Sequence, residues 1–97
     1  MNESEKILKT LRELKKSISD KYKVKRIGLF GSYLRGEQTV NSDIDILTNF
    51  QDDADLFDLV GLAQFLEEKL QQKVDIVSDS ALRQELKDVI LKEAVYI

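Results

Sequence analysis

Apolar and polar positions follow two different periods along this chain, and each period predicts one kind of secondary structure. In residues 3 to 21 the apolar side chains recur every three or four positions, which predicts an amphipathic helix. The stripe consists of Ile7, Leu11, Leu14 and Ile18. Asn2, with Glu5 three residues later, resembles a capping box and marks the start of this helix.

Three short runs rich in branched and aromatic residues predict the strands of a sheet. They span residues 24–30, 43–49 and 73–77. The first run ends at Gly31-Ser32, which we interpret as a turn into a short helix over residues 33–37, followed by a loop at 39–41. Further turns are expected at 51–55 and 78–80.

Two more helices complete the pattern. Asp55 is the expected N-cap of a helix over residues 56–70, in which Gly61 costs about 1 kcal/mol relative to alanine. A final helix is predicted over residues 82–96. The side chains expected to be buried on these two helices are Leu59, Leu62, Ala63, Leu66, Leu70, Leu86, Val89, Ile90 and Ala94. The succession of elements indicates a small α/β domain spanning residues 1–97, with helices packed on a sheet.

Composition excludes several kinds of chemistry. The 97 residues include no cysteine and no histidine, so there are no disulfides, no thiolate nucleophile, and neither the usual zinc ligand nor the usual general base. No apolar run reaches the length of a membrane span, and the N-terminus is too polar for a signal peptide. We therefore expect a cytoplasmic protein that does not associate with membranes.

Charge is distributed unevenly along the chain. Residues 1–26 contain nine Lys or Arg and four Asp or Glu, a local charge of +5, whereas the remainder contains six and fourteen, a local charge of −8. The basic face of the first helix is either a solvated surface, which is the commoner case, or a surface for an acidic partner or a nucleic acid. We expect no direct binding of nucleic acid. A homo-oligomer stays open as an alternative to a monomer.

The candidate chemistry lies between residues 30 and 47. Because side chains alternate along a strand, Asp43 and Asp45 share one face, and Ile44 lies on the other. Two carboxylates side by side repel each other, and a hard cation such as Mg²⁺, which binds carboxylates together with substrate phosphates, would relieve that repulsion. Gly31 and Ser32, which ten residues separate from Asp43, could supply the backbone and hydroxyl donors of a phosphate site.

This stretch also has simpler interpretations. Taken alone, Asp43 and Asp45 are more often a solvated strand face, and Gly31-Ser32 is more often an ordinary turn. An EF-hand starting at Asp43 fails, because the oxygen ligand, glycine and glutamate that it requires are replaced by Leu47, Thr48 and Ala54. A P-loop fails because no lysine followed by serine or threonine comes after the glycines.

Together, Gly31-Ser32, ten intervening residues and Asp43-x-Asp45 resemble the signature of the DNA polymerase beta-type nucleotidyltransferase superfamily. The flanking residues Arg35-Gly36 and Ser42 are similar to those of its small members, the minimal nucleotidyltransferase (MNT) domains. These domains are commonly the antitoxins of HEPN/MNT toxin–antitoxin pairs. The third carboxylate of the signature would be Asp75, and the resemblance extends over nearly the whole chain.

The resemblance implies a mixed sheet and a metal-dependent enzyme that transfers AMP from ATP. The implied catalytic residues, which would also hold two Mg²⁺ ions, are Asp43, Asp45 and Asp75. The implied nucleotide-binding residues are Gly31, Ser32, Arg35 and Ser42. Two of these residues have alternatives to a contact with the nucleotide. Arg35 could form a structural ion pair instead, and Ser42 could order the start of the strand.

The resemblance also implies a partner. The acceptor would be a hydroxyl group on a HEPN-type ribonuclease toxin, and the family resemblance implies that this hydroxyl belongs to a tyrosine. The chain would act as the antitoxin of that toxin. One competing hypothesis is a non-catalytic antitoxin that sequesters its partner. Another is transfer to a small molecule, as in aminoglycoside nucleotidyltransferases, which are larger.

Overall fold

The computed structural model describes residues 1–97 and contains four α-helices, one short 3-10 helix and four strands. In chain order these are α1 (Glu3–Tyr22), β1 (Val24–Phe30), α2 (Gly31–Arg35), β2 (Ile44–Phe50), α3 (Leu56–Leu70), β3 (Val74–Ser78), η1 (Asp79–Ala81), α4 (Gln84–Glu93) and β4 (Val95–Tyr96). The strands predicted at 24–30, 43–49 and 73–77 are thus present, with shifts of at most one residue.

The four strands form one mixed sheet in the order β3-β2-β1-β4. β1 is antiparallel to both β2 and β4, whereas β2 and β3 are parallel. The parallel pair is possible because α3 forms the crossover between its strands. The predicted mixed sheet with helices packed on it is confirmed.

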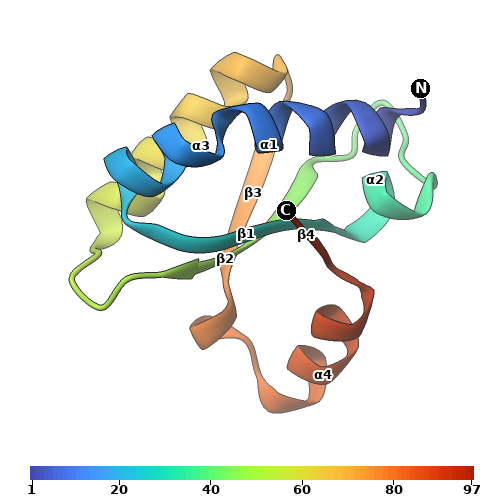
Figure 1. The fold of residues 1–97 in the computed structure, drawn as a ribbon. Coiled ribbons are helices and arrows are strands. Elements are labelled where there is room, and N and C mark those ends of the chain that lie inside the picture. Colours follow the sequence, from blue (N-terminus) through green and yellow to red (C-terminus); the bar gives the residue numbers. More distant parts are fainter.

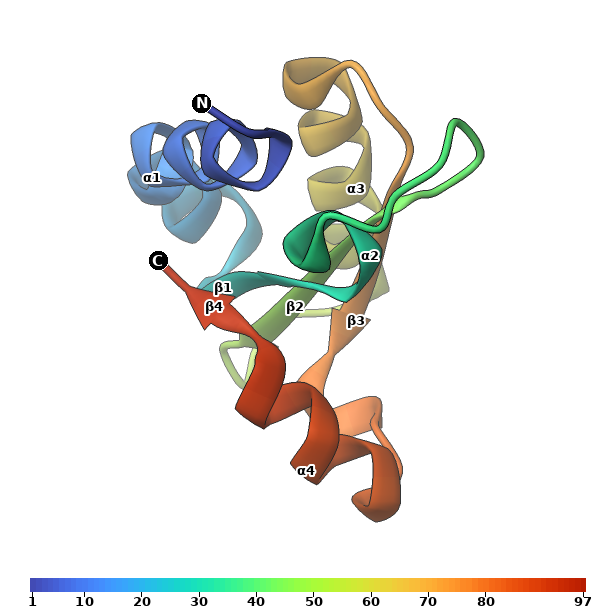
Figure 2. The ribbon, with the colours of Figure 1, turned by 90° about the vertical axis from the view of Figure 1, so that its right-hand side faces the viewer.

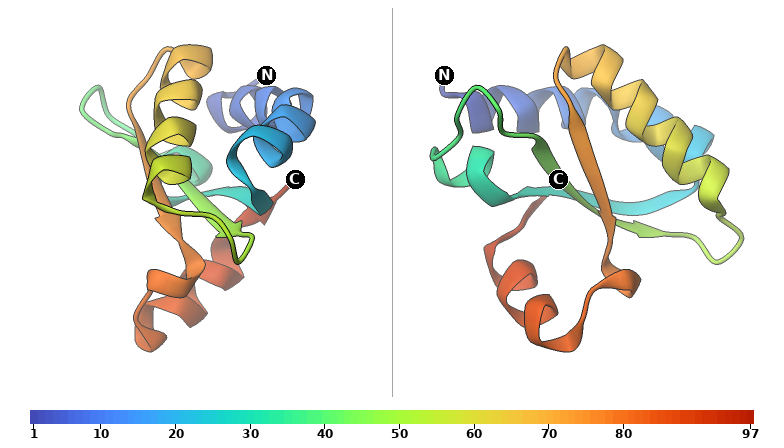
Figure 3. Two further views of the ribbon diagram at one scale, coloured as in Figure 1. Left: turned by 90° about the vertical axis from the view of Figure 1, so that its left-hand side faces the viewer. Right: turned by 180° about the vertical axis from the view of Figure 1, so that it is seen from behind.

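The helices cover the two faces of the sheet unequally. α1 and α3 lie together on one face, whereas α4 lies beyond the opposite face, connected to the sheet by η1 and β4 (Figures 1 and 2). The views from the side and from behind show the same arrangement (Figure 3). One face of the sheet therefore packs against α1 and α3 in the main core, and the opposite face is only partly covered by other elements.

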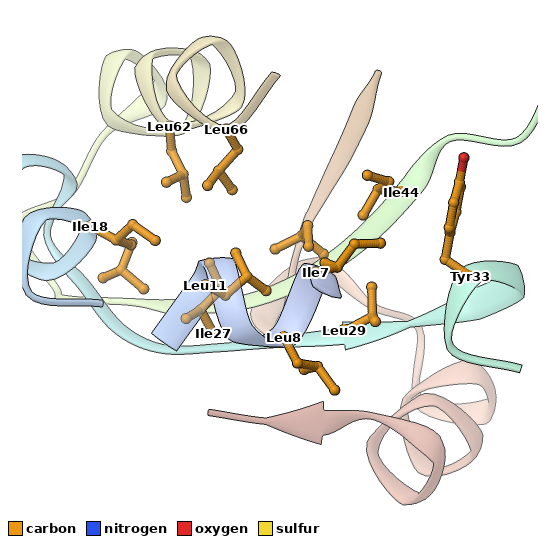
Figure 4. Close-up of a cluster of buried hydrophobic side chains, with 12 residues drawn as sticks. Ile7, Leu8, Leu11, Ile18, Ile27, Leu29, Tyr33, Ile44, Leu62 and Leu66 are labelled. Carbon is orange, nitrogen blue, oxygen red and sulfur yellow. The ribbon is translucent and has the colours of Figure 1, made fainter. Parts of the chain in front are cut away.

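The main core lies between the sheet and the helices α1 and α3 (Figure 4). Leu11, Leu29, Ile46, Leu62 and Leu66 are completely buried in it. Burying a side chain of this size contributes about 1.5–3 kcal/mol. Of the predicted stripe of α1, Ile7, Leu11 and Ile18 are buried and Leu14 is partly buried. Leu62 and Leu66 belong to the predicted buried face of α3, which is confirmed for them.

Both predicted helix starts are confirmed. Asn2 accepts a hydrogen bond from the backbone N–H of Glu5 at 2.8 Å, and Asp55 accepts one from the N–H of Asp58 at 3.1 Å. Gly61 gives close packing of α3 against α1 rather than against the sheet. A Cβ atom at Gly61 would come within 2.9 Å of the Tyr22 ring, which explains why this helix tolerates a glycine in its interior.

The sequence-based bounds of α2 and of the final helix were wrong. α2 begins at Gly31 rather than at residue 33, and it ends before Gly36, whose φ of 72° forms a left-handed C-cap. The final helix ends at Glu93, and the chain continues as the short strand β4, which the apolar pattern did not reveal. Burial on α4 was also overestimated, since Leu86 and Val89 are 51% and 62% exposed.

None of the helices is both long enough and apolar enough to span a membrane.

Candidate functional site

The start of β2 and the middle of β3 carry the predicted carboxylates. Ile44 and Ile46 are buried in the main core, so Asp45 between them projects from the opposite, partly open face. In the parallel pairing of the two strands, Asp45 lies directly beside Asp75. Asp43 precedes the strand and is exposed. The sheet therefore brings Asp45 and Asp75 together, and the charge of Asp43 acts on Asp45 from the residue before the strand.

The carboxylate of Asp45 is in an environment that disfavours its charge. Burial raises the pKa of Asp45 above its usual range, and the negative charges of Asp75, Asp43 and Glu93 raise it further, whereas Arg35 opposes the change. No three carboxylates of the chain converge closely enough to form a metal-binding group by themselves. The site thus concentrates negative charge around one half-buried carboxylate.

Gly31 connects β1 to α2 directly against this carboxylate. Its φ of +79° lies in the left-handed region, and a Cβ atom there would collide with the carboxylate of Asp45. The antiparallel pairing of Phe30 with Asp45 explains this proximity, because it aligns the end of β1 with the start of β2. Glycine is therefore required both by the backbone conformation and by the space that Asp45 occupies.

Glu93, the last residue of α4, contacts the same turn and was not identified from the sequence. Its Oε1 atom accepts a hydrogen bond from the backbone N–H of Gly31 at 2.7 Å and another from Nη1 of Arg35 at 2.8 Å. Arg35 also donates through Nε to Glu37 at 2.6 Å. One local signal exists: helices favour basic residues in their last turn, and an acidic residue at the very end is unusual.

The two predicted serines occupy different environments. Ser32 is half-buried in α2 beside Gly31, and its hydroxyl makes no hydrogen bond within the protein. The hydroxyl of Ser42 instead accepts a hydrogen bond from the backbone N–H of Thr39 at 2.9 Å. Ser42 therefore orders the turn that leads into β2, as its alternative interpretation predicted, while its predicted role toward nucleotide stays a prediction.

The largest concavity of the molecule, about 520 Å³, is not at these carboxylates. It lies at the other end of β2, between that strand's exit, the start of α3 and the turn after β3. Smaller hollows flank the candidate site, one of about 300 Å³ beside Arg35 and one of about 270 Å³ beside Asp43. The large concavity also has carboxylates, amides and hydroxyls in its lining. We assign the chemistry to the open carboxylate face, because there the Gly31 turn packs directly against Asp45 and Asp75 lies beside it on the neighbouring strand.

Comparison with known proteins supplies independent information. The profile of a family described as "Nucleotidyltransferase domain" matches residues 11–97. The chain is 38% identical over 93 residues to the protein adenylyltransferase MntA of Thermococcus cleftensis, covering 96% of this chain and 94% of that protein.

Two solved structures are similar as well. One is a toxin–antitoxin with AMP-PNP, with a TM-score of 0.68 and 34% identity, covering 96% of this chain and 70% of the other. The second is a complex of the tri-AMPylated HEPN toxin of Shewanella oneidensis with its MNT antitoxin. Its TM-score is 0.60 and its identity 29%, and the match covers 97% of this chain and 67% of the other.

Proposed function

We propose that the chain, which belongs to the nucleotidyltransferase domain family and is a nucleotidyltransferase, transfers AMP from ATP to a hydroxyl group of a HEPN-type toxin. The chain would thereby act as the antitoxin of that toxin. The observation that carries this proposal is the packing of the Gly31 turn against Asp45, with Asp75 beside it on the neighbouring strand. This arrangement sets phosphate donors next to carboxylates, which is what phosphoryl chemistry requires.

The donors would hold the phosphates of ATP. The N–H of Gly31 donates a hydrogen bond to the carboxylate of Glu93, and the Ser32 hydroxyl has no hydrogen-bond partner within the protein. Arg35 adds a cation that two carboxylates, Glu37 and Glu93, already approach. A guanidinium is well suited to phosphate because it presents several donors in one plane. Ser42 supports this site indirectly, through the turn before Asp43.

Mg²⁺ fits the donor chemistry of the site. It is usually bound by one or two carboxylates together with substrate phosphates, so it does not require a preformed group of three. Asp43, Asp45 and Asp75 would hold two ions, and bound Mg²⁺ supplies charge neutralisation at the α-phosphate and at the pyrophosphate leaving group. The raised pKa of Asp45 is consistent with a carboxylate that gains a cation on substrate binding.

In the proposed reaction, the oxygen of the acceptor hydroxyl forms a bond to the α-phosphorus of ATP, and the bond to the bridging oxygen of the β-phosphate breaks. Pyrophosphate leaves, and the hydroxyl proton is released. Asp75 is the exposed neighbour of Asp45 and would accept that proton. Tyrosine is the acceptor side chain that the family resemblance implies. The cytoplasmic location stays a prediction.

The test separates transfer from sequestration. The purified chain is mixed with a candidate HEPN-type partner and Mg–ATP, and the partner is weighed by intact-mass spectrometry. We expect a gain of one or more AMP units that is lost with Asp75→Asn and with Asp43→Asn. Asp52→Asn is the matched control, because Asp52 is exposed and makes no hydrogen bond or ion pair. Peptide mapping then identifies the modified residue.

Full neutralisation of the partner without a mass change, equally effective in Asp43→Asn, would refute transfer and would establish sequestration instead.

A further inference from the structure

The carboxylate of Glu93 occupies two donors that the proposed function assigns to the phosphates of ATP. A backbone amide has a single hydrogen, and that of Gly31 is already engaged by Glu93 at 2.7 Å. The same oxygen of Glu93 accepts from Arg35 at 2.8 Å. An incoming phosphate oxygen would therefore have to replace the carboxylate oxygen at Gly31.

This contact is poorly explained as a stabilising ion pair. Glu93 adds a negative charge to a site in which the charges of Asp75 and Asp43 already act on Asp45, and it is one of the groups that raise the pKa of Asp45. It also ends a helix with an acid, where the helix dipole favours a base. Residues that violate local preferences in this way are expected at functional sites rather than at purely structural ones.

The backbone around Glu93 is held by strand pairing, whereas its side chain is partly exposed to solvent. β4 begins two residues later and pairs with β1, so that Val95 lies opposite Leu29. The N–H of Ile97 donates to the carbonyl of Ile27 at 3.1 Å, which secures the strand further. The side chain of Glu93 itself is 27% exposed. It can rotate away from Gly31 without moving the strand or disturbing the main core.

From these contacts we infer that Glu93 is an internal competitor of the nucleotide. In the free enzyme its carboxylate holds the N–H of Gly31 and the guanidinium of Arg35 in a phosphate-binding arrangement. On binding, a phosphate of ATP takes over both donors and the carboxylate turns to solvent. Glu93 therefore sets the affinity for ATP rather than the chemistry, and the inference rests on the proposed function.

The experiment measures the binding of Mg–AMP-PNP by calorimetry, without any partner protein. Glu93→Gln keeps the shape and an acceptor oxygen but removes the charge, and charge-assisted hydrogen bonds are about twice as strong as neutral ones. We expect the Kd to fall about tenfold, which corresponds to about 1.4 kcal/mol. Glu85→Gln, an exposed and unpartnered residue in the first turn of the same helix, should leave the Kd unchanged.

A second measurement follows the side chain itself. The carboxyl carbon resonance of Glu93 in the wild-type protein should shift toward that of the solvated Glu85 as Mg–AMP-PNP saturates the site. Tighter binding in Glu93→Gln together with this shift supports displacement. If the wild-type protein binds Mg–AMP-PNP and Glu93→Gln binds it equally well or more weakly, the inference is overturned. An unchanged Glu93 resonance at saturation overturns it as well. Neither result affects the proposed function. If neither protein binds Mg–AMP-PNP, the proposed function fails, and the inference fails with it.

Discussion

Replacing Gly31 with alanine tests the central feature of the site, the packing of the turn against Asp45. Two separate penalties are expected. The φ of Gly31 is +79°, and a Cβ atom there would collide with the Asp45 carboxylate. Gly36 supplies an internal reference, because its φ is +72° and nothing lies within 4 Å of its Cβ position. Gly36→Ala therefore has the conformational penalty without the collision.

The two penalties can be estimated separately. A non-glycine residue in the left-handed region costs about 1–2 kcal/mol, and this is the whole loss of stability expected for Gly36→Ala. Inserting a methyl group into an occupied space costs about 1–3 kcal/mol more. Gly31→Ala should therefore lower the free energy of unfolding by about 2–5 kcal/mol, the sum of these ranges.

Urea unfolding of the ligand-free protein measures both values, and a double-mutant cycle assigns the difference to Asp45. In an Asp45→Ala background the carboxylate is gone, so Gly31→Ala should cost little more than Gly36→Ala does. The coupling free energy between positions 31 and 45 should be about 1–3 kcal/mol, the steric term alone. Equal losses for Gly31→Ala and Gly36→Ala in the wild-type background would refute the packing argument.

Two further predictions concern charge and ligand at the same site. Asp45→Asn should stabilise the ligand-free protein at pH 7, because burial first, and then Asp75 and Asp43, raise the pKa of Asp45 and disfavour its charged form. The gain in the free energy of unfolding over wild type should shrink as pH falls through the raised pKa toward the ordinary value of 3.8. Urea unfolding at several pH values measures this gain, and a gain that persists in acid would contradict the reasoning. Mg–ATP at 100 times its Kd should stabilise the protein by about 2.7 kcal/mol, and calorimetric melting that shows no shift at millimolar levels would rule out the nucleotide site.

The sequence predicted the main core well because amphipathic periods report which residues share a face. Leu11 and Ile18 on α1, and Leu62 and Leu66 on α3, all follow from the helical spacing and are all buried. The same reasoning failed for α4, where Leu86 and Val89 share the expected face but lie in solvent. Periodicity identifies an apolar face, but burial also requires another element in contact with that face, and no local pattern encodes it.

The site was predictable to the extent that it depends on short connections. The end of β1 and the start of β2 are joined by α2 and one loop, and the antiparallel register of Phe30 with Asp45 brings Gly31 to that carboxylate. Asp75 is different, because it reaches Asp45 only through the crossover helix α3 and a parallel register that the residues alone do not specify. Its expected place came from the family resemblance.

The shortness of β4 explains why neither this strand nor the role of Glu93 was predicted. β4 contains only Val95 and Tyr96, and so short a strand is below the length at which alternation can be distinguished from a helical pattern. Because the final helix was extended through it to residue 96, Glu93 lay inside a predicted helix, and nothing distinguished it from the other charged residues there. The strand instead ends the helix at Glu93 and turns this side chain toward Gly31, 62 residues earlier in the chain. The contact between the two therefore exists because of an element that only the three-dimensional pairing with β1 defines.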